Sequence, residues 1–168
     1  MPKLIQLSPS SQQNTGFTHK SIFNAADVAA LTSGTAYSVL PQKNAAGTWV
    51  VVASASAATV PAGTLVEKVA LRVTTAFASA GNTITLVAIV GDGGDTSRYF
   101  ASTSLKTAGY PVSPPLKVPL LYVTADTIDI IFTAAVEAIT LLTAGEVEVY
   151  LALRDLDALS RPNILANA

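Results

Sequence analysis

Hydrophobic and polar residues alternate along several stretches of this chain, which is the pattern of strands with one face buried. The clearest stretch is residues 68–77. Its alternation predicts a core-facing set made of Val69, Leu71, Val73, Thr75 and Phe77. The residues between them, Ala70, Arg72, Thr74 and Ala76, are then predicted to form the outer face of the strand.

Two later stretches have the same period of two. In residues 127–132 the pattern turns Ile128, Ile130 and Phe132 inward and Asp129 outward. Gly145 opens the last predicted strand. Its inward set is Val147, Val149, Leu151 and Leu153, and its outward set is Glu146, Glu148, Tyr150 and Arg154.

The segments between these strands contain turn signals and weaker strand patterns. A turn over residues 79–82 separates strand 68–77 from a strand at 83–90, and we expect these two strands to form a hairpin. A turn around residues 44–47 separates strand faces at Tyr37 and Val39 from those at Trp49 and Val51. Residues 138–142 are a further short strand candidate, whereas residues 102–109 read as irregular or weakly helical. Pro119 makes a strand at 116–123 an edge strand, since proline lacks the amide donor.

One short helix is predicted over residues 24–31. Asn24 is suited to the N-cap position, and Asp27 falls in the first turn, where the helix dipole favours a carboxylate. Val28 and Leu31 lie on one face of this helix, and Gly34 follows its end.

These patterns together predict an all-β fold, an antiparallel two-sheet sandwich or jelly roll with at most one short helix. The polar, unperiodic N-terminal stretch and the residues after Asp155 are expected to be extended arms. The predicted organisation is an N-terminal arm over residues 1–22, a β-sandwich domain over residues 23–155 and a C-terminal arm over residues 156–168.

The composition is low in charge. Charged residues make up 12 % of the 168 residues and hydrophobic residues 50 %, against about 25 % charged residues in an average globular chain. Either Ser and Thr side chains keep this surface hydrated, or partner proteins cover much of it, and we favour the covered surface because monomers rarely expose large apolar patches. The formal net charge of −1 offers no strong field for nucleic acid or an anionic membrane. No cysteine is present, and the apolar part of the uncharged stretch 44–66 is too short for a membrane span. The first residues, with one positive charge and a short apolar run, do not resemble a signal peptide.

Candidate chemistry is sparse. His19, the one histidine, has no nucleophile or orienting acid near it in the sequence. The loop with Asp92 and Asp95 is rich in glycine and could offer oxygen ligands to Ca²⁺, but its spacing matches neither a calcium loop nor a phosphate loop. A tight turn in which Asp caps backbone amides explains it better.

The remaining acidic and aromatic residues have structural explanations too. Asp126 and Asp129 flank a strand start, and Glu146 and Glu148 share an outer strand face, where solvated carboxylates are common. Arg72 is expected to meet Glu148, Asp129 or a partner protein. The aromatic residues are scattered, which leaves a sugar-binding platform open, although Trp49 is expected in the core: Tyr37, Trp49, Tyr99, Phe100, Tyr110 and Tyr122.

The stretch from about residue 65 to residue 155 resembles the small virion structural proteins of tailed bacteriophages, of the capsid decoration or cement type. The resemblance rests on residues 68–77, on the Gly-Asp turn and its continuation over residues 90–100, and on the final strand over residues 144–151. It implies an Ala/Thr-rich β-sandwich that binds the outer capsid surface as an oligomer, across joints between major capsid subunits.

The expected function is therefore a capsid decoration protein on the exterior of the virion, with the major capsid protein and copies of itself as partners. We expect no enzymatic activity, no catalytic or metal-ligating residues, no cofactor, and no nucleic-acid or membrane partner. The alternative is a tail or head-fibre protein, or a receptor- or carbohydrate-binding β-sandwich module of a virion.

Overall fold

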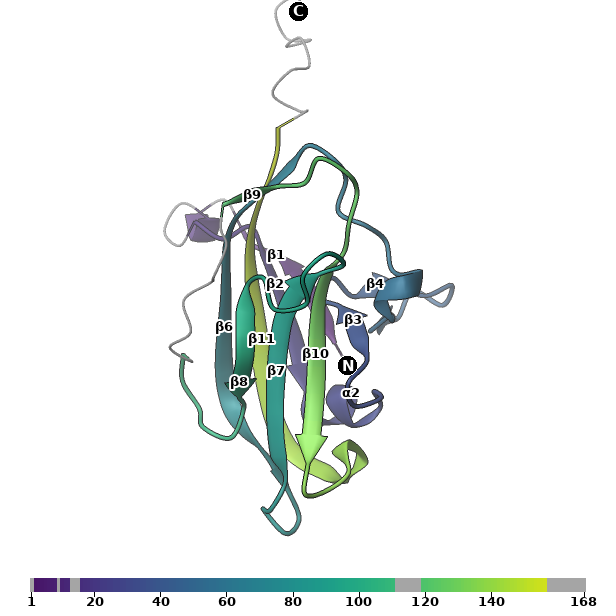
Figure 1. The fold of residues 1–168 in the computed structure, drawn as a ribbon, viewed down its shortest axis with the longest axis vertical. Helices are drawn as coiled ribbons and strands as arrows, with labels where there is room; N and C mark the ends of the chain where they lie inside the picture. The colour runs from purple at the N-terminus through teal and green to yellow at the C-terminus, as the bar shows by residue number, and fades with distance from the viewer. Residues whose placement is uncertain (1, 9, 13–15, 111–118, 157–168) are drawn as a thin grey trace, which may run out of the picture.

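Two facing antiparallel sheets form the body of the molecule in the computed structural model (Figure 1). The structure describes residues 2–8, 10–12, 16–110 and 119–156. The larger sheet has five strands in the order β1-β2-β11-β6-β9. Their bounds are β1 Lys3–Gln6, β2 His19–Asn24, β11 Leu142–Asp155, β6 Thr64–Ser79 and β9 Leu120–Leu121.

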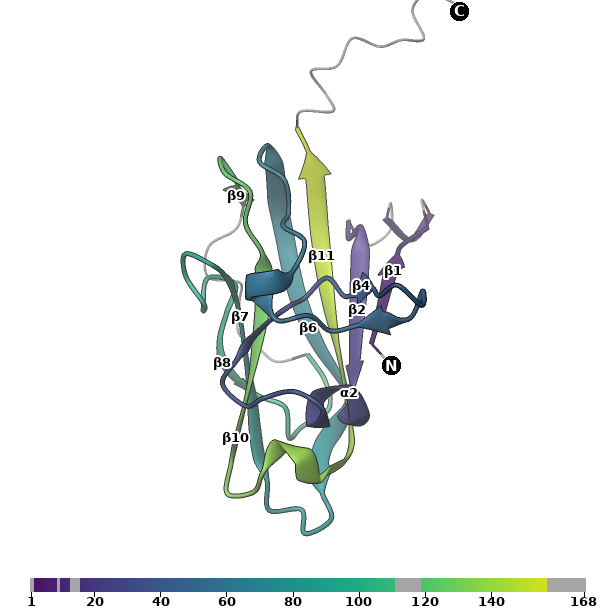
Figure 2. The same cartoon turned by 90° about the vertical axis from the view of Figure 1, so that its right-hand side faces the viewer.

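The smaller sheet has four strands in the order β3-β10-β7-β8 (Figure 1). In Figure 2 its strands β7, β8 and β10 lie to the left of β11, β2 and β1 of the larger sheet. Their bounds are β3 Ala36–Ser38, β10 Ile128–Ala135, β7 Thr85–Asp92 and β8 Phe100–Ser104. A separate hairpin pairs β4, Gln42–Lys43, with β5, Trp49–Val50, across the predicted turn at residues 44–47. Because every named pairing between strands is antiparallel, the predicted all-β two-sheet sandwich is confirmed.

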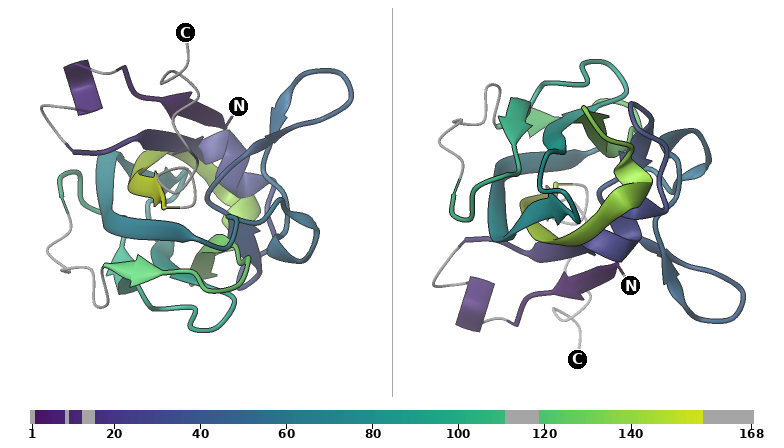
Figure 3. Two further views of the ribbon diagram at one scale, coloured as in Figure 1. Left: turned by 90° about the horizontal axis from the view of Figure 1, so that it is seen from above. Right: turned by 90° about the horizontal axis from the view of Figure 1, so that it is seen from below.

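The core lies between the two sheets, as the views along the strands show (Figure 3). β6 and β11 turn fully buried side chains toward the smaller sheet, including Leu71, Phe77 and Leu151, and β10 meets them with Ile130 and Phe132. The rings of Phe23 and Phe132 pack edge to face with centroids 5.9 Å apart. Burial of such side chains is the main source of stability in a sandwich of this kind.

The helix begins where the sequence predicts it. α2 spans Ala25–Ala29, and Asn24 accepts a hydrogen bond from the amide of Asp27 at 3.0 Å. The Asn24 amide donates in return to the Asp27 carboxylate at 3.1 Å, which completes a capping box. Val28 is fully buried and α2 packs against β11, so the helix covers one end of the core. A further helical turn lies at residues 10–12.

β6 and β7 do not form the predicted hairpin. β6 lies in the larger sheet beside β11, whereas β7 lies in the smaller sheet between β10 and β8, so the turn after Ser79 carries the chain from one sheet to the other. Thr75 also differs from its prediction, since it is exposed. Register shifts between β6 and β11 interrupt the period of two on either side of it, which moves Thr75 out of the core face.

Other boundaries differ from those expected. Residues 3–6 and 19–22 belong to β1 and β2 of the larger sheet, whereas the sequence predicts an arm up to residue 22. Residues 102–104 lie in β8 instead of an irregular segment, and the predicted strand at 138–142 is a 3-10 turn, η2, Ile139–Leu141. In the described part of the predicted edge strand, residues 119–123, the structure has β9 at the rim of the larger sheet. Residues 111–118 and nearly all of the predicted C-terminal arm, residues 157–168, lie outside the described residues.

Candidate interaction surface

A cluster of aromatic and charged side chains lies on the outer face of the five-stranded sheet. Pairing places Glu148 of β11 between Ile22 of β2 and Arg72 of β6, and Tyr150 between Lys20 and Ala70. Neighbouring residues on one face of a sheet interact directly, so these two rows bring opposite charges and rings together. We call this set the outer-face cluster: Phe17, Lys20, Arg72, Tyr110, Glu148 and Tyr150.

Glu148 is the centre of the cluster. Its side chain accepts from the Lys20 ammonium group at 3.0 Å and from the Tyr150 hydroxyl at 2.6 Å, and the Arg72 guanidinium lies 3.7 Å away. Of the partners that the sequence left open for Arg72, the structure brings Glu148 to it. The expectation of a solvated Glu148 is wrong, because the residue is only 6 % exposed beneath these partners.

The electrostatics of the cluster hold Glu148 in its ionised form. Burial by itself would raise the pKa of Glu148, but the Tyr150 hydroxyl and the two cations outweigh it and lower the pKa below its ordinary value. Burial and the Glu148 carboxylate raise the pKa of Tyr150 to about 12. Two cations and one carboxylate leave the cluster with one net positive charge, on a chain whose formal net charge is −1.

Aromatic rings surround this charged centre. The Phe17 ring lies 5.6 Å from that of Tyr150, the Lys20 ammonium lies 5.8 Å from the Tyr150 ring centroid, and the Arg72 guanidinium lies 5.5 Å from that of Tyr110. Tyr110 is 66 % exposed. A hollow of about 160 Å³ opens between Phe17, Ala70, Tyr110 and Tyr150. Exposed aromatic and arginine side chains of this kind are typical anchors of protein interfaces.

The sequence patterns pointed to Arg72, Tyr110, Glu148 and Tyr150 and offered Glu148 as one partner of Arg72, but they did not indicate the whole cluster and missed Phe17 and Lys20. The missed signal was the register of β2, since Lys20 lies opposite Tyr150 only in that pairing. Tyr110 reaches the cluster because the bridge between Gly109 and Val73 carries the chain back to β6.

The loop with Asp92 and Asp95 is a tight turn in which Asp92 caps backbone amides, as the sequence predicts. Asp92 accepts from the amides of Gly94 at 3.0 Å and Asp95 at 2.8 Å, and it forms an ion pair with Arg98. The Tyr122 hydroxyl, itself 2.8 Å from that of Tyr99, adds a contact to Asp92 at 3.4 Å. The loop is thus tied into the core from several sides.

Asp129 is buried, although its strand pattern predicts a side chain on the outer face. It is 4 % exposed and accepts from the Ser54 hydroxyl at 2.7 Å. Ser54 belongs to the short 3-10 turn η1, Ser54–Ser56, and this segment lies over the outer face of β10 at that point. Burial raises the pKa of Asp129 above its ordinary value.

The other candidate positions are dispersed. His19 is half-buried at the start of β2, with Nδ1 2.8 Å from the Thr18 hydroxyl, and burial lowers its pKa. Glu146 accepts from the Thr74 hydroxyl at 2.7 Å, and Asp126 accepts from the amides of Thr127 and Gly93. The side chain of Trp49 lies outside the described part of the structure. Within the described ranges, no three His, Cys, Asp or Glu side chains gather as a metal site would require, and no helix is long and apolar enough to cross a membrane.

Comparisons with known proteins give one structural similarity. No protein-family model matches the chain, and no curated protein is significantly similar to it. The chain is similar to a solved structure described as the Cyanophage Pam1 capsid asymmetric unit, with 21 % sequence identity and a TM-score of 0.40 over 77 % of this chain and 81 % of that chain. A similarity of this size carries no argument by itself, so the proposals below rest on the residues of this chain.

Proposed function

We propose that this chain is a structural protein of a tailed-phage virion and acts as a capsid decoration, or cement, protein. It binds the outer surface of the head and stabilises contacts between major capsid subunits. The observation that carries the proposal is the outer-face cluster, a set of aromatic and cationic side chains in which Arg72 and Tyr110 are exposed, on a chain with only 12 % charged residues.

The proposed mechanism is mass action. A protein that binds only the assembled shell stabilises it, by about 2.7 kcal/mol per site when its free concentration is a hundred times the Kd. A standard interface covers about 800 Å² of each partner, which is roughly a tenth of the 8692 Å² surface of this chain. Symmetry repeats the contact over the shell, so a modest affinity per site is sufficient.

The same proposal includes the expected partners and chemistry. The chain binds the major capsid protein and copies of itself on the virion exterior, and it has no enzymatic activity and no cofactor. The contacts of Glu148 support this, because its carboxylate binds Lys20, Arg72 and Tyr150 and is buried beneath them. Nucleic acid and membranes are not expected partners of a surface with so little net charge.

Co-sedimentation with empty phage heads tests this proposal. We expect the wild-type chain to pellet with the heads and the double variant Arg72→Glu/Tyr110→Ala to bind at least about ten-fold more weakly, since hot-spot residues contribute about 2 kcal/mol or more each. Lys43→Glu is the matched control, because it makes the same charge change on the β4–β5 hairpin. Thermal unfolding of each variant checks the fold. A wild-type chain that stays in the supernatant excludes the cement function, and undiminished binding of the double variant excludes the outer-face cluster as the docking surface.

A second candidate is a receptor- or carbohydrate-binding module of a tail or head fibre. The observation that favours it is the hollow between Phe17, Tyr110 and Tyr150, since aromatic rings beside charged hydrogen-bonding groups suit a sugar ring. A glycan array distinguishes the two functions. Glycan binding that Tyr110→Ala abolishes, together with no binding to heads, supports this candidate; an array without hits removes it.

A further inference from the structure

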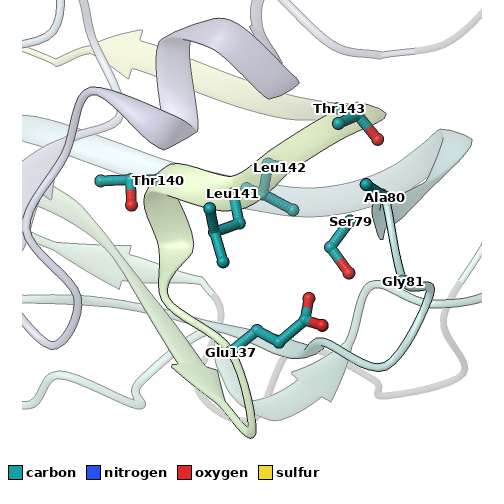
Figure 4. Close-up of a pocket in the computed structure, with 8 residues that line it drawn as sticks. All are labelled: Ser79, Ala80, Gly81, Glu137, Thr140, Leu141, Leu142 and Thr143. Atoms are coloured by element: carbon teal, nitrogen blue, oxygen red, sulfur yellow. The ribbon is translucent and has the colours of Figure 1, made fainter.

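A second hollow lies at one end of the sandwich, between the turn that follows β6 and the segment that joins β10 to β11 (Figure 4). Its volume is about 340 Å³. The lining combines hydroxyl, carboxylate and aliphatic groups: Ser79, Ala80, Gly81, Glu137, Thr140, Leu141, Leu142 and Thr143. We call it the end hollow. It does not include any residue of the outer-face cluster.

The two segments that border the end hollow have strained backbones. Among the described residues, Asn82 (φ 53°) and Val136 (φ 73°) are the two non-glycine residues with positive φ. Asparagine tolerates this conformation, but a β-branched residue rarely adopts it. Strain of this kind is found preferentially at functional sites. Here it holds the Val136 side chain 80 % exposed at the tip, while the next residue, Glu137, reaches across the hollow toward Ser79 (Figure 4).

Glu137 is the one charged group in the lining. Its Oε1 accepts from the Thr83 hydroxyl, and the Ser79 hydroxyl lies beside the same carboxylate. These two hydroxyls, with Lys106 at longer range, lower the pKa of Glu137, so the group is ionised at neutral pH. The ammonium group of Lys106 is itself directed to the Asn82 carbonyl oxygen at 3.0 Å.

The Ser79 side chain is buried beside the Glu137 carboxylate. It is only 4 % exposed, and its hydroxyl lies against this carboxylate without a hydrogen bond of regular geometry. Ser79 and Thr83 together therefore hold the carboxylate where it faces the hollow (Figure 4). Leu141, which also lines the hollow, is 54 % exposed and provides an apolar surface near the carboxylate.

We propose that the end hollow binds a basic side chain of a partner protein, a lysine or arginine flanked by an apolar residue. The anionic Glu137 is complementary to the cation, Ser79 and Thr140 supply hydroxyl groups in the hollow, and Leu141 contacts the apolar neighbour. A charged hydrogen bond to a carboxylate is stronger than a neutral one, so the cation is the specific element of recognition. This site is separate from the outer-face cluster, so its test does not depend on whether the capsid-binding proposal is correct.

Peptide titration followed by NMR tests the proposal on the full ¹⁵N-labelled chain. The probe is acetyl-Leu-Lys-Ala-amide, and the matched peptide has glutamine in place of lysine. We expect the lysine peptide to shift the amide signals of Gly81 and Thr140 in a saturable way, and the glutamine peptide to bind at least about five-fold more weakly. Equal shifts with both peptides, or no shift with either, would overturn the proposal.

Variants then separate charge from apolar contact. Glu137→Gln is expected to weaken binding of the lysine peptide about ten-fold, and Leu141→Ser about three-fold. Leu141→Ser keeps the test decisive if Glu137→Gln folds poorly, because the Leu141 side chain is largely exposed and its replacement should leave the fold intact. Glu67→Gln is the matched control, since Glu67 pairs with Arg154 on β6 and β11 away from the hollow. Unchanged binding by Glu137→Gln, or equal loss in the control, contradicts the assignment.

Discussion

Gly145 is the position where a single methyl group is expected to cost most. It lies in β11 with φ 138°, a region that residues with a side chain rarely adopt. A Cβ atom there would sit 2.3 Å from Cγ and Cδ1 of Phe77, whose ring is fully buried in the core. The substitution Gly145→Ala therefore adds backbone strain and a steric overlap that the packed core cannot easily relieve.

The magnitude follows from these two contributions. Residues held in sparsely populated backbone regions cost about 1–3 kcal/mol, and overpacking a core costs about 1–3 kcal/mol more. The expected loss of about 2–6 kcal/mol is a large part of a typical free energy of unfolding of about 5–15 kcal/mol. For a chain of 168 residues, each kcal/mol corresponds to roughly 2–4 °C in Tm, so a loss of about 4 kcal/mol lowers Tm by about 8–16 °C.

Urea unfolding followed by circular dichroism measures the effect, and Gly109→Ala is its matched control. Gly109 has φ 134°, but no atom lies within 4 Å of the position that its Cβ would occupy. It therefore carries the backbone strain without the overlap, and we expect it to be at least about 1 kcal/mol less destabilised than Gly145→Ala. Equal losses in the two variants would refute the role of Phe77. In the background of Gly145→Ala, Phe77→Leu should cost less than in the wild type, since the smaller side chain relieves the overlap.

Two further predictions concern the outer-face cluster and the strained tip. Glu148→Gln should lower the free energy of unfolding at pH 7 by about 1–3 kcal/mol, because Lys20 and Arg72 lose their carboxylate. The pKa of Glu148 is lowered in the folded state, so the stabilisation that its carboxylate provides is present above the unfolded pKa of about 4.3 and disappears as the pH falls through the folded pKa. Between pH 7 and pH 3, urea unfolding should therefore show a smaller decrease in the free energy of unfolding for Glu148→Gln than for the wild type. Parallel pH dependences of the two proteins would contradict this. Val136→Asn should raise stability by up to about 1 kcal/mol, because asparagine tolerates positive φ and the exposed valine buries little; a less stable variant in the same assay would show that the valine side chain matters for the fold.

The local features of the fold are the ones that the sequence predicts well. The capping box of α2 involves residues three apart, so Asn24 and Asp27 suffice to place the start of the helix. The inward positions of Leu71, Val73 and Phe77 follow from the period of two within one strand. The backbone caps supplied by Asp92 are equally local, because the accepting oxygen and the donating amides lie within three residues.

Strand partners could not be predicted in the same way. The period of two shows which face of a strand is buried but not which strand lies beside it, because the backbone donors and acceptors are the same in every strand. The adjacent strands β6 and β7 were therefore expected to pair, whereas they lie in different sheets. Thr75 was misplaced for a related reason, since a bulge depends on the partner strand.

The sequence by itself determined an all-β chain of low charge, its one capped helix and the core face of its main strands, because each of these depends on residues close together in the chain. Only the tertiary structure decided that Lys20, Arg72 and Glu148 meet on one outer face, that Asp129 is covered by η1, and that Glu137 faces the end hollow. The residues in each of these contacts are about 50 to 130 positions apart in the sequence, or belong to two segments that are distant in the chain. Whether a polar residue is buried and paired depends on which residues the fold places around it, and the alternation within one strand does not indicate those residues.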